Sequence, residues 1–428
     1  MSGDIKHFVL HRSWVTVPDA KVWLGKTFDL AKAYKQFHVS KHNRWASAIT
    51  TFNPVSGKPA LFSQVTLPFG ASAAVLHFNR AARFLWACGL FMGICWLNFF
   101  DDYPTLAPKI VAKAVKSAGE LVMGLQGWKY SDDPLKDLDF AAAFVSLGVS
   151  FAVDRIVLKD ASVRNKPVRV QQVSDDLKCV VASQQLTTPH ADTLRGRLQF
   201  MEAVTFGRAA RTVFSVFNRH GATSTKLLPP DLQKLAWLCD VVPRPISSKH
   251  VGKRILLFTD GACEYEGNVA VLTCGAVLYL PVSKQMFYFG CHVNTALALE
   301  WGSDGRKQLL TECELFPGLL ARLCWKQYIQ GSNMVVYVDS EPAKYSLIRG
   351  HSDTPSCDLL VQATCFEDCN LKVWPWFSRV PSYSNIADDP SRLNWSAFLK
   401  DFPDAIETPV MHLQPRSLLD GFARLPQP

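Results

Sequence analysis

Two sets of acidic residues stand at the ends of apolar segments, where their carboxylates could bind metal ions. In the N-terminal set, Asp29 follows a short apolar segment, and Asp101 and Asp102 end the aromatic run LNFFDDY. Adjacent aspartates at the turn of a buried β-hairpin are unfavourable, because like charges repel and burial disfavours the charged form. A divalent cation removes that cost, and oxygen ligands suit Mg²⁺. Taken alone, either acidic site is more simply an ordinary turn.

The C-terminal set contains four carboxylates that stand beside apolar segments. They are Asp260 at the end of ILLFTD, Glu314 in TECELF, Asp339 at the end of MVVYVD and Asp388 in NIADDPSR. Two of them have neighbours that could take their place. Glu312 is a rival for Glu314, and Asp389 is a weaker rival for Asp388.

The elements that must position the C-terminal set follow a clear order. Strands are expected at 255–260, 269–279, 287–291, 334–339 and 371–380, and helices at 314–329, 341–350 and 357–369. Asp388 precedes one more short helix. Pro317 is tolerable only near the first turn of its helix, because proline has no N–H to donate. The Pro-, Ser- and Lys-rich segment 241–253 is expected to be a linker, and 175–240 to be mostly helical.

Composition narrows the class of protein. The chain has 428 residues, 48% hydrophobic content and a formal net charge of +9, which favours two or three packed domains and polyanionic partners. Its 12 cysteines form no CxxC pair, so reduced thiols in an intracellular protein, cytoplasmic or nuclear, are expected. The N-terminus lacks the apolar core of a signal peptide. The uncharged run 84–100 is interpreted as a buried helix followed by a buried strand rather than a membrane span.

Five segments in the N-terminal half resemble the motifs of reverse transcriptases, in the family's order. They are FDLAKAYKQF (28–37), LPFGASAAVLHFNR (67–80), NFFDDY (98–103), GWKYSDD (127–133) and SLGVSF (146–151). Phe99 stands where the family usually has tyrosine. Five motifs at plausible spacings are far more specific than one.

The resemblance implies a role for each matched residue. Asp29 and Asp101 would hold two metal ions, and Asp102 would complete the acidic cluster. Tyr34 would be the steric gate against a 2′-OH, although alone it is equally a core aromatic residue. The remaining matches are Phe69, Gly70 and Lys129 at the nucleotide site and Leu147 and Gly148 at the primer grip.

Four segments in the C-terminal half resemble ribonuclease H domains of retrotransposons, most like those of DIRS-type elements. They are FTDGAC, ECEL, VDSEPAKYSLIRG and WFSRVPSYSNIADDPSR. In that fold Asp260, Glu314, Asp339 and Asp388 would converge and bind two Mg²⁺ or Mn²⁺ ions. Such a site clamps the attacking water and the leaving oxygen of a phosphodiester. Glu314 is preferred over Glu312 because LFPGLLA follows it, as in the family, and Asp388 keeps the ADxxSR spacing.

The basic segment 194–220 resembles the thumb and connection helices that follow the palm. Its arginines would contact the phosphate backbone of a template–primer duplex, and the alternative is a solvated helix face. They are Arg195, Arg197, Arg208, Arg211 and Arg219.

The expected fold class is therefore α+β and α/β. A reverse transcriptase palm with partial fingers would span 1–155, a helical thumb and connection 156–250, a ribonuclease H-like domain 251–400 and a tail 401–428. The implied function is RNA-directed DNA polymerase with ribonuclease H activity, and the partners are an RNA template, a DNA primer, RNA–DNA hybrid and dNTPs, with no membrane.

The polymerase half departs from the family pattern at its start. Only 28 residues precede Asp29, and no basic motif there matches the grip that fingers exert on the triphosphate. Lys6, Arg12, Lys21 and Lys26 are candidates without a pattern. We therefore expect a weak polymerase beside a competent nuclease, and the alternative is a decayed, non-enzymatic nucleic-acid-binding remnant.

Overall fold

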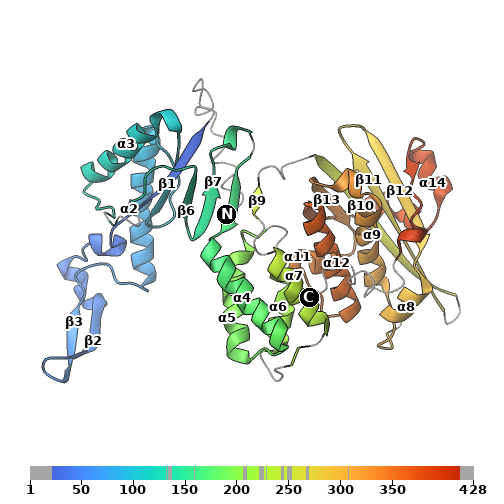
Figure 1. Cartoon of the computed structure of the whole chain (residues 1–428), viewed down its shortest axis with the longest axis horizontal. Coiled ribbons are helices and arrows are strands. Elements are labelled where there is room, and N and C mark those ends of the chain that lie inside the picture. The colour runs from blue at the N-terminus through green and yellow to red at the C-terminus, as the bar shows by residue number, and fades with distance from the viewer. Residues whose placement is uncertain are drawn as a thin grey trace. The chain divides into compact units, whose positions relative to one another are not determined.

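The structure is a computed structural model, and the chain divides into two compact units, residues 1–163 and 164–428 (Figure 1). The described residues are 22–131, 133, 137–158, 160–205, 210–220, 226–227, 229–241, 245–247, 253–266, 269–306 and 308–414.

The first unit is built around a three-stranded antiparallel sheet. Its strands lie in the order β1 (Trp23–Asp29), β5 (Asp102–Pro108) and β4 (Cys95–Trp96). The helices α2 (Ser72–Phe91) and α3 (Ala112–Leu125) pack against β4 and β5. Phe28, Phe78, Leu85, Trp96 and Tyr103 form the core between them. This packing places the end of β1 beside the start of β5.

Short elements surround this sheet. The 3-10 helices η2 (Ala33–Gln36) and η3 (Lys41–Ser47) follow β1, and β2 (Ala48–Asn53) pairs with β3 (Lys58–Ser63). The 3-10 helix η4 (Lys109–Val111) leads into α3. A second hairpin joins β6 (Ala143–Ser146) to β7 (Val149–Ala152), and η5 (Ile156–Leu158) follows it.

The uncharged run 84–100 forms the end of α2 and then β4, so the predicted order of helix and strand is confirmed. The helix is buried on one face only: Leu85 is inaccessible, whereas Phe84 is 64% exposed. No helix among the described residues has the length and apolar character that a membrane crossing requires.

The second unit contains a six-stranded mixed sheet. Its order is β14 (Trp374–Arg379), β13 (Asn333–Val338), β10 (Arg254–Glu266), β11 (Val269–Leu280), β12 (Gln285–His292) and β15 (Ile406–Glu407). The three strands β10, β11 and β12 form an antiparallel meander. The strands β13 and β14 run parallel to β10, and β15 runs parallel to β12.

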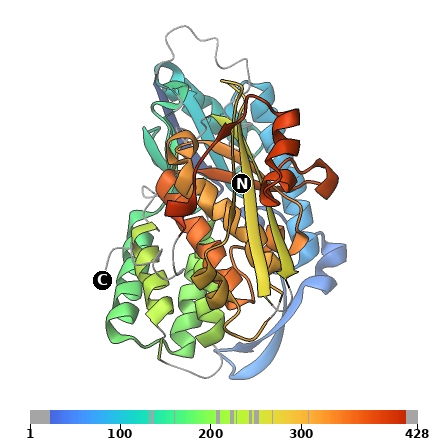
Figure 2. The same ribbon diagram turned by 90° about the vertical axis from the view of Figure 1, so that its right-hand side faces the viewer.

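Helices cover both faces of this sheet (Figures 1 and 2). One face packs against α9 (Leu310–Cys324) and α12 (Pro355–Leu371), and the other against α13 (Asp388–Ser391) and α14 (Trp395–Asp401). Side chains of β11 alternate accordingly. Ala276 and Leu278 join the core under α9, whereas Val277 joins Phe398 of α14 on the opposite face.

The remaining elements of this part are short. They are α8 (Thr295–Trp301), α10 (Lys326–Ile329), α11 (Glu341–Arg349), η8 (Ser382–Ser384) and η9 (Met411–Leu413). From β10 onward the predicted strands and helices occur in the predicted order, and Gly350 ends α11 as expected. The sequence did not predict α8 or β15, and the helix expected at 314–329 is divided into α9 and α10.

The prediction for Pro317 is wrong. The helix α9 begins at Leu310, so Pro317 lies inside it rather than near its first turn. Because proline has no N–H, it cannot bond the carbonyl of Cys313 four residues earlier. Both residues are buried, so tertiary packing outweighs the local preference.

A helical layer precedes the sheet in the same unit, as predicted for 175–240. It contains α4 (Pro167–Ser183), α5 (Thr188–Glu202), α6 (Ala210–His220) and α7 (Pro229–Val241), flanked by the short strands β8 (Ser162–Asn165) and β9 (Ile246–Ser247). Trp237 of α7 packs against Phe366 and Cys369 of α12. Parts of the predicted linker 241–253 lie outside the described residues.

Candidate functional site

Three of the predicted acids meet at one point of the second unit. Asp260 lies in β10, Asp339 directly follows β13, and Glu314 lies in α9. The parallel pairing of Thr259 with Val338 puts Asp260 and Asp339 next to each other in neighbouring strands. One carboxylate oxygen from each of the three acids lies within 4.8 Å of the others. Asp260 stands in the middle of its strand and does not end it, because β10 continues to Glu266.

Burial and mutual repulsion disfavour the charged forms of these acids. Burial above all, and then the charges of Asp339 and Asp388, raise the pKa of Asp260 to about 7, although the hydrogen bond from the Ser391 hydroxyl acts in the opposite direction. Burial above all, then the neighbouring Asp260 and Asp339, raise the pKa of Glu314 to about 10, against a backbone hydrogen bond from Gly261. A cation at this point would stabilise the deprotonated forms.

The donor set fits a hard divalent cation. Glu314 Oε2 and Asp339 Oδ1 are buried, and neither has a hydrogen-bond partner among the described residues. All the converging donors are carboxylate oxygens, which suit Mg²⁺ or Mn²⁺ rather than softer metals. The residues present therefore fit the metal that the sequence implies.

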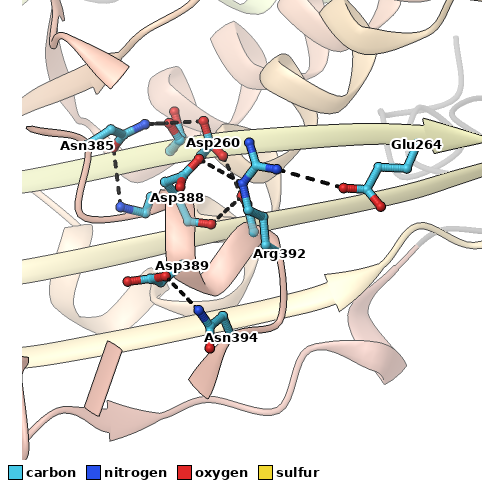
Figure 3. A network of polar contacts seen from close by, with 10 residues as sticks. Asp260, Glu264, Asn385, Asp388, Asp389, Arg392 and Asn394 are labelled. Carbon is cyan, nitrogen blue, oxygen red and sulfur yellow. Dashed lines mark hydrogen bonds and ion pairs between the residues drawn. The ribbon is translucent and has the colours of Figure 1, made fainter. Parts of the chain in front are cut away.

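Asp388, the fourth predicted acid, lies beside this group and not within it. It is the first residue of α13, and its Oδ1 accepts a hydrogen bond from Arg392 Nε at 3.0 Å. Arg392 also reaches Glu264, with 3.8 Å between Nη1 and Oε1 (Figure 3). The charge of Asp388 nevertheless acts on Asp260. The structure thus brings three acids together and ties the fourth to an arginine.

The two rival acids have partners elsewhere. Glu312 is fully buried, where its Oε1 accepts from Ser356 Oγ at 2.6 Å and pairs with Arg306 Nη2 at 2.9 Å. Asp389 accepts from Asn394 Nδ2 at 3.1 Å (Figure 3). Neither belongs to the cluster of three.

Two of the three N-terminal acids, Asp29 and Asp101, line a pocket of the first unit. Asp29 ends β1 opposite Asp102, and Asp101 lies in the turn before β5. The pocket has a volume of about 350 Å³. Its lining residues are Asp29, Leu30, Lys32, Ala33, Tyr34, Phe69, Phe100 and Asp101. Asp102 is not among them, and within the described residues Asp29 and Asp101 belong to no group of three metal-binding side chains.

Tyr34 lines the pocket and also packs against the hydrophobic core of the first unit. Its ring stacks on Phe78 with 4.6 Å between centroids and lies 5.1 Å from Phe69. Burial and then the charge of Asp101 raise the pKa of its hydroxyl. Both interpretations of Tyr34, the gate and the core aromatic, are compatible with this position.

The other nucleotide-site and primer-grip matches lie outside that pocket lining. Gly70, with φ 86°, precedes α2. Lys129 has an exposed side chain, and its backbone N–H and C=O both bond the Gln36 amide, at 2.8 and 2.7 Å. Leu147 and Gly148, with φ 51° and 76°, form the two-residue turn between β6 and β7. Two successive left-handed residues are typical of a tight hairpin.

The basic candidates are mostly held by acids. Arg195 pairs with Asp192 at 2.8 Å, Arg197 pairs with Asp176, and Arg211 pairs with Glu202 at 2.7 Å. Arg208 lies outside the described residues, as do Lys6, Arg12 and Lys21. Lys26 is buried and pairs with Asp137 at 2.9 Å, so it is no candidate for gripping a triphosphate. Phosphate contact by the arginines stays a prediction.

Sequence reasoning missed several residues at these sites. Lys32 lines the pocket and has a left-handed backbone conformation, with φ 51°. No local sequence motif predicts either feature. Asn385 and Ser391 bind Asp260 across more than a hundred residues. Ser391 is the serine of the ADxxSR segment that contains Asp388, so the sequence does hold a signal for it.

The sequence matches no family model and no curated protein. Among solved structures, it is similar to a foamy viral protease-reverse transcriptase in complex with double-stranded DNA (13% identity, TM-score 0.41, 83% of this chain and 56% of that chain). It is also similar to a foamy viral protease-reverse transcriptase in complex with RNA/DNA hybrid (10%, 0.38, 87% and 67%). A third is ribonuclease H1 from the halophilic archaeon Halobacterium salinarum (15%, 0.26, 34% and 98%).

This chain therefore spans 56% of the length of the first of these proteins. All three TM-scores are below 0.5.

Proposed function

We propose that the second unit is a metal-dependent nuclease that cuts the RNA strand of an RNA–DNA hybrid. The observation that carries this proposal is the buried cluster of Asp260, Glu314 and Asp339, with two carboxylate oxygens that have no partner among the described residues. Four-carboxylate sites of the ribonuclease H type are the family expectation for these positions, and Asp388 supplies the fourth charge beside the cluster.

The roles of the side chains follow from their positions. Asp260, Glu314 and Asp339 would hold the cations, and Asp388 would join them on leaving Arg392. Bound metal ions supply a clamp for the attacking water and for the leaving oxygen of the phosphodiester. Arg392, which is half exposed beside the cluster, could then pair with a backbone phosphate of the substrate instead.

The test is cleavage of a labelled RNA strand, in a hybrid, by the purified full chain with Mg²⁺ or Mn²⁺. We expect Asp339→Asn and Asp260→Asn to abolish cleavage and Asp388→Asn to lower it strongly. Asp389→Asn is the matched control, because this neighbouring acid contacts Asn394, and it should keep most of the activity. Cleavage that survives in Asp339→Asn would refute the proposed site.

For residues 1–250, which comprise the first unit and the helical layer of the second, we propose descent from an RNA-directed DNA polymerase, with 1–155 as palm and 156–250 as thumb and connection. The pocket shared by Asp29, Asp101, Tyr34 and Phe69 supports a site for a dNTP. Primer extension on an RNA template tests it, with Asp101→Asn as control. Robust extension without hybrid cleavage would overturn our ranking of the two activities.

A non-enzymatic, nucleic-acid-binding role is the second candidate. It is favoured by the formal net charge of +9, which suits a polyanionic partner. Salt-dependent duplex binding without metal-dependent extension would support it. The DIRS-type affiliation rests on the sequence motifs and stays part of the proposal.

A further inference from the structure

The carboxylate of Asp260 is held from one segment that lies far along the chain. Ser391 Oγ donates to Asp260 Oδ2, and Asn385 Nδ2 donates to Asp260 Oδ1 at 3.3 Å. Asn385 Nδ2 also donates to the carbonyl of Thr259 at 3.1 Å. Each oxygen of Asp260 therefore has a donor from the segment 385–391, whose path beside Asp260 is drawn in Figure 3.

Both donors are removed from solvent. Ser391 is 0% exposed and Asn385 is 5% exposed. The Ser391 hydroxyl also lies 2.8 Å from the carbonyl of Asp388, but it has one proton to give. An ionised carboxylate is the stronger acceptor, so the proton belongs to the bond with Asp260 when that acid is charged.

The segment is seated on the sheet by two glycines. A Cβ on Gly275 of β11 would lie 2.7 Å from the carbonyl carbon of Pro390 and 2.8 Å from Ser391 Cα. A Cβ on Gly290 of β12 would lie 2.6 Å from the ring of Trp395 and 2.9 Å from the carbonyl carbon of Pro390. Real Cβ contacts do not come this close, so glycine is what allows the segment to reach Asp260.

We propose that Asn385 and Ser391 are positioning residues that fix the orientation of the Asp260 carboxylate toward Glu314 and Asp339. This inference rests on the proposed nuclease site. Three buried acids repel one another, so a carboxylate without donors would turn away from the other two. The two donors hold one oxygen each and leave other lone pairs for the cation. The same segment carries Asp388, so it sets the positions of two acids together.

The direct test is Mn²⁺ binding by calorimetry, on the full chain and on Ser391→Ala and Asn385→Ala. Asp260→Asn defines the heat that comes from other sites. We expect each variant to weaken the Asp260-dependent site by roughly 10- to 100-fold, the usual effect of removing a residue that orients a metal ligand. Ser396→Ala, which removes an exposed hydroxyl of α14, should leave the affinity unchanged.

Hybrid cleavage supplies a second readout. The Mg²⁺ concentration for half-maximal rate should rise in both variants while the KM for the hybrid stays constant, and excess Mg²⁺ should restore the rate. A purely structural defect would instead lower the unfolding temperature without rescue by metal. The two variants are independent, so Asn385→Ala decides the question if Ser391→Ala does not fold.

Two outcomes would overturn the inference, and they differ. If both variants bind Mn²⁺ within twofold of the parent while Asp260→Asn does not, the cluster binds metal but Asn385 and Ser391 do not position it. If the parent and Asp260→Asn give the same heat, the proposed metal site itself is wrong, and the inference falls with it.

Discussion

Gly261 lies directly against the backbone carbonyl of Cys313. A Cβ on Gly261 would overlap that carbonyl group and come within 2.7 Å of Glu314 N. This close contact between β10 and α9 lies beside the site, because Asp260 precedes the glycine and Glu314 follows the cysteine. Because Gly261 has no side chain, β10 and α9 can come close enough to bring Asp260 and Glu314 together.

Gly261→Ala should consequently destabilise the second unit and weaken its metal site. Forcing a methyl group into a packed contact costs about 1–3 kcal/mol. Urea unfolding measures the loss, and Mn²⁺ titration measures the effect on the site. Gly196→Ala is the matched control: this glycine lies in α5 with open space at its Cβ, so alanine should stabilise by about 0.5–1 kcal/mol. Equal stability of the two variants would contradict the packing argument.

The stability of the metal-free protein should fall as pH rises. The pKa of Asp260 is raised to about 7 and that of Glu314 to about 10, so the folded protein keeps protons that the unfolded chain has already lost. The stability that these groups contribute is therefore fully present below about pH 4, the unfolded pKa range, and it is lost as pH rises through 7 and toward 10. Unfolding temperatures between pH 5 and 9 measure this slope, and Glu314→Gln should flatten it.

Metal should reverse the trend, because it binds the deprotonated carboxylates and releases their protons. Adding Mg²⁺ should therefore raise the unfolding temperature more at pH 8 than at pH 5. A gain that is equal at both values, or larger at pH 5, would show that these acids do not bind the ion.

Lys32 should contribute to nucleotide binding in the first unit. It is the one cationic side chain among the described residues that line the pocket. A hydrogen bond to a charged group contributes about 1.5 kcal/mol or more, so Lys32→Gln should weaken dTTP binding by roughly tenfold. Equilibrium binding in Mg²⁺ measures this without requiring polymerisation. Lys35→Gln removes a nearby exposed charge outside the pocket, and an equal loss in that variant would point to a general electrostatic effect.

The buried pair of Arg322 and Asp368 should be a vulnerable point of the fold. Arg322 Nε and Nη2 donate to the two oxygens of Asp368 at 2.7 and 3.1 Å, joining α9 to α12. Removing one partner leaves an uncompensated buried charge, so Arg322→Met should cost about 3–5 kcal/mol in urea unfolding. Arg322→Met combined with Asp368→Leu should recover most of that loss. A double variant as unstable as the single one would contradict this explanation.

Much of the second unit could be predicted from sequence, because its strands are short apolar runs and its acids stand beside them. At two places the ends of these apolar runs do not match the ends of the strand or helix. The polar residues GACEYE hid the continuation of β10 beyond Asp260, and Pro317 suggested a later start for α9. The local sequence pattern cannot show that the burial of Pro317 outweighs the helical hydrogen bond that this proline removes.

Contacts between residues far apart in the sequence also could not be predicted. Ser391 and Asn385 reach Asp260 only after the sheet has formed, and Glu312 differs from Glu314 only in which face of α9 it occupies. The ion pair between Arg392 and Asp388 joins residues only four positions apart in the sequence. That this pair lies beside the acid cluster depends on the position of β10, which carries Asp260. The sequence indicated which acids were candidates, whereas only the tertiary structure shows that Asp260, Glu314 and Asp339 lie close together.

The segment after α14 covers part of one edge of the large sheet. Ile406 and Glu407 pair with Phe287 and Tyr288 of β12, and the Gln414 side chain bonds the carbonyl of His292 at 2.8 Å. An uncovered strand edge offers its backbone groups to other chains and promotes aggregation. Residues 406–414 therefore cover part of the β12 edge, and we expect them to limit such association. A shortened protein that stops at residue 400 would expose β12 and should self-associate as its concentration rises.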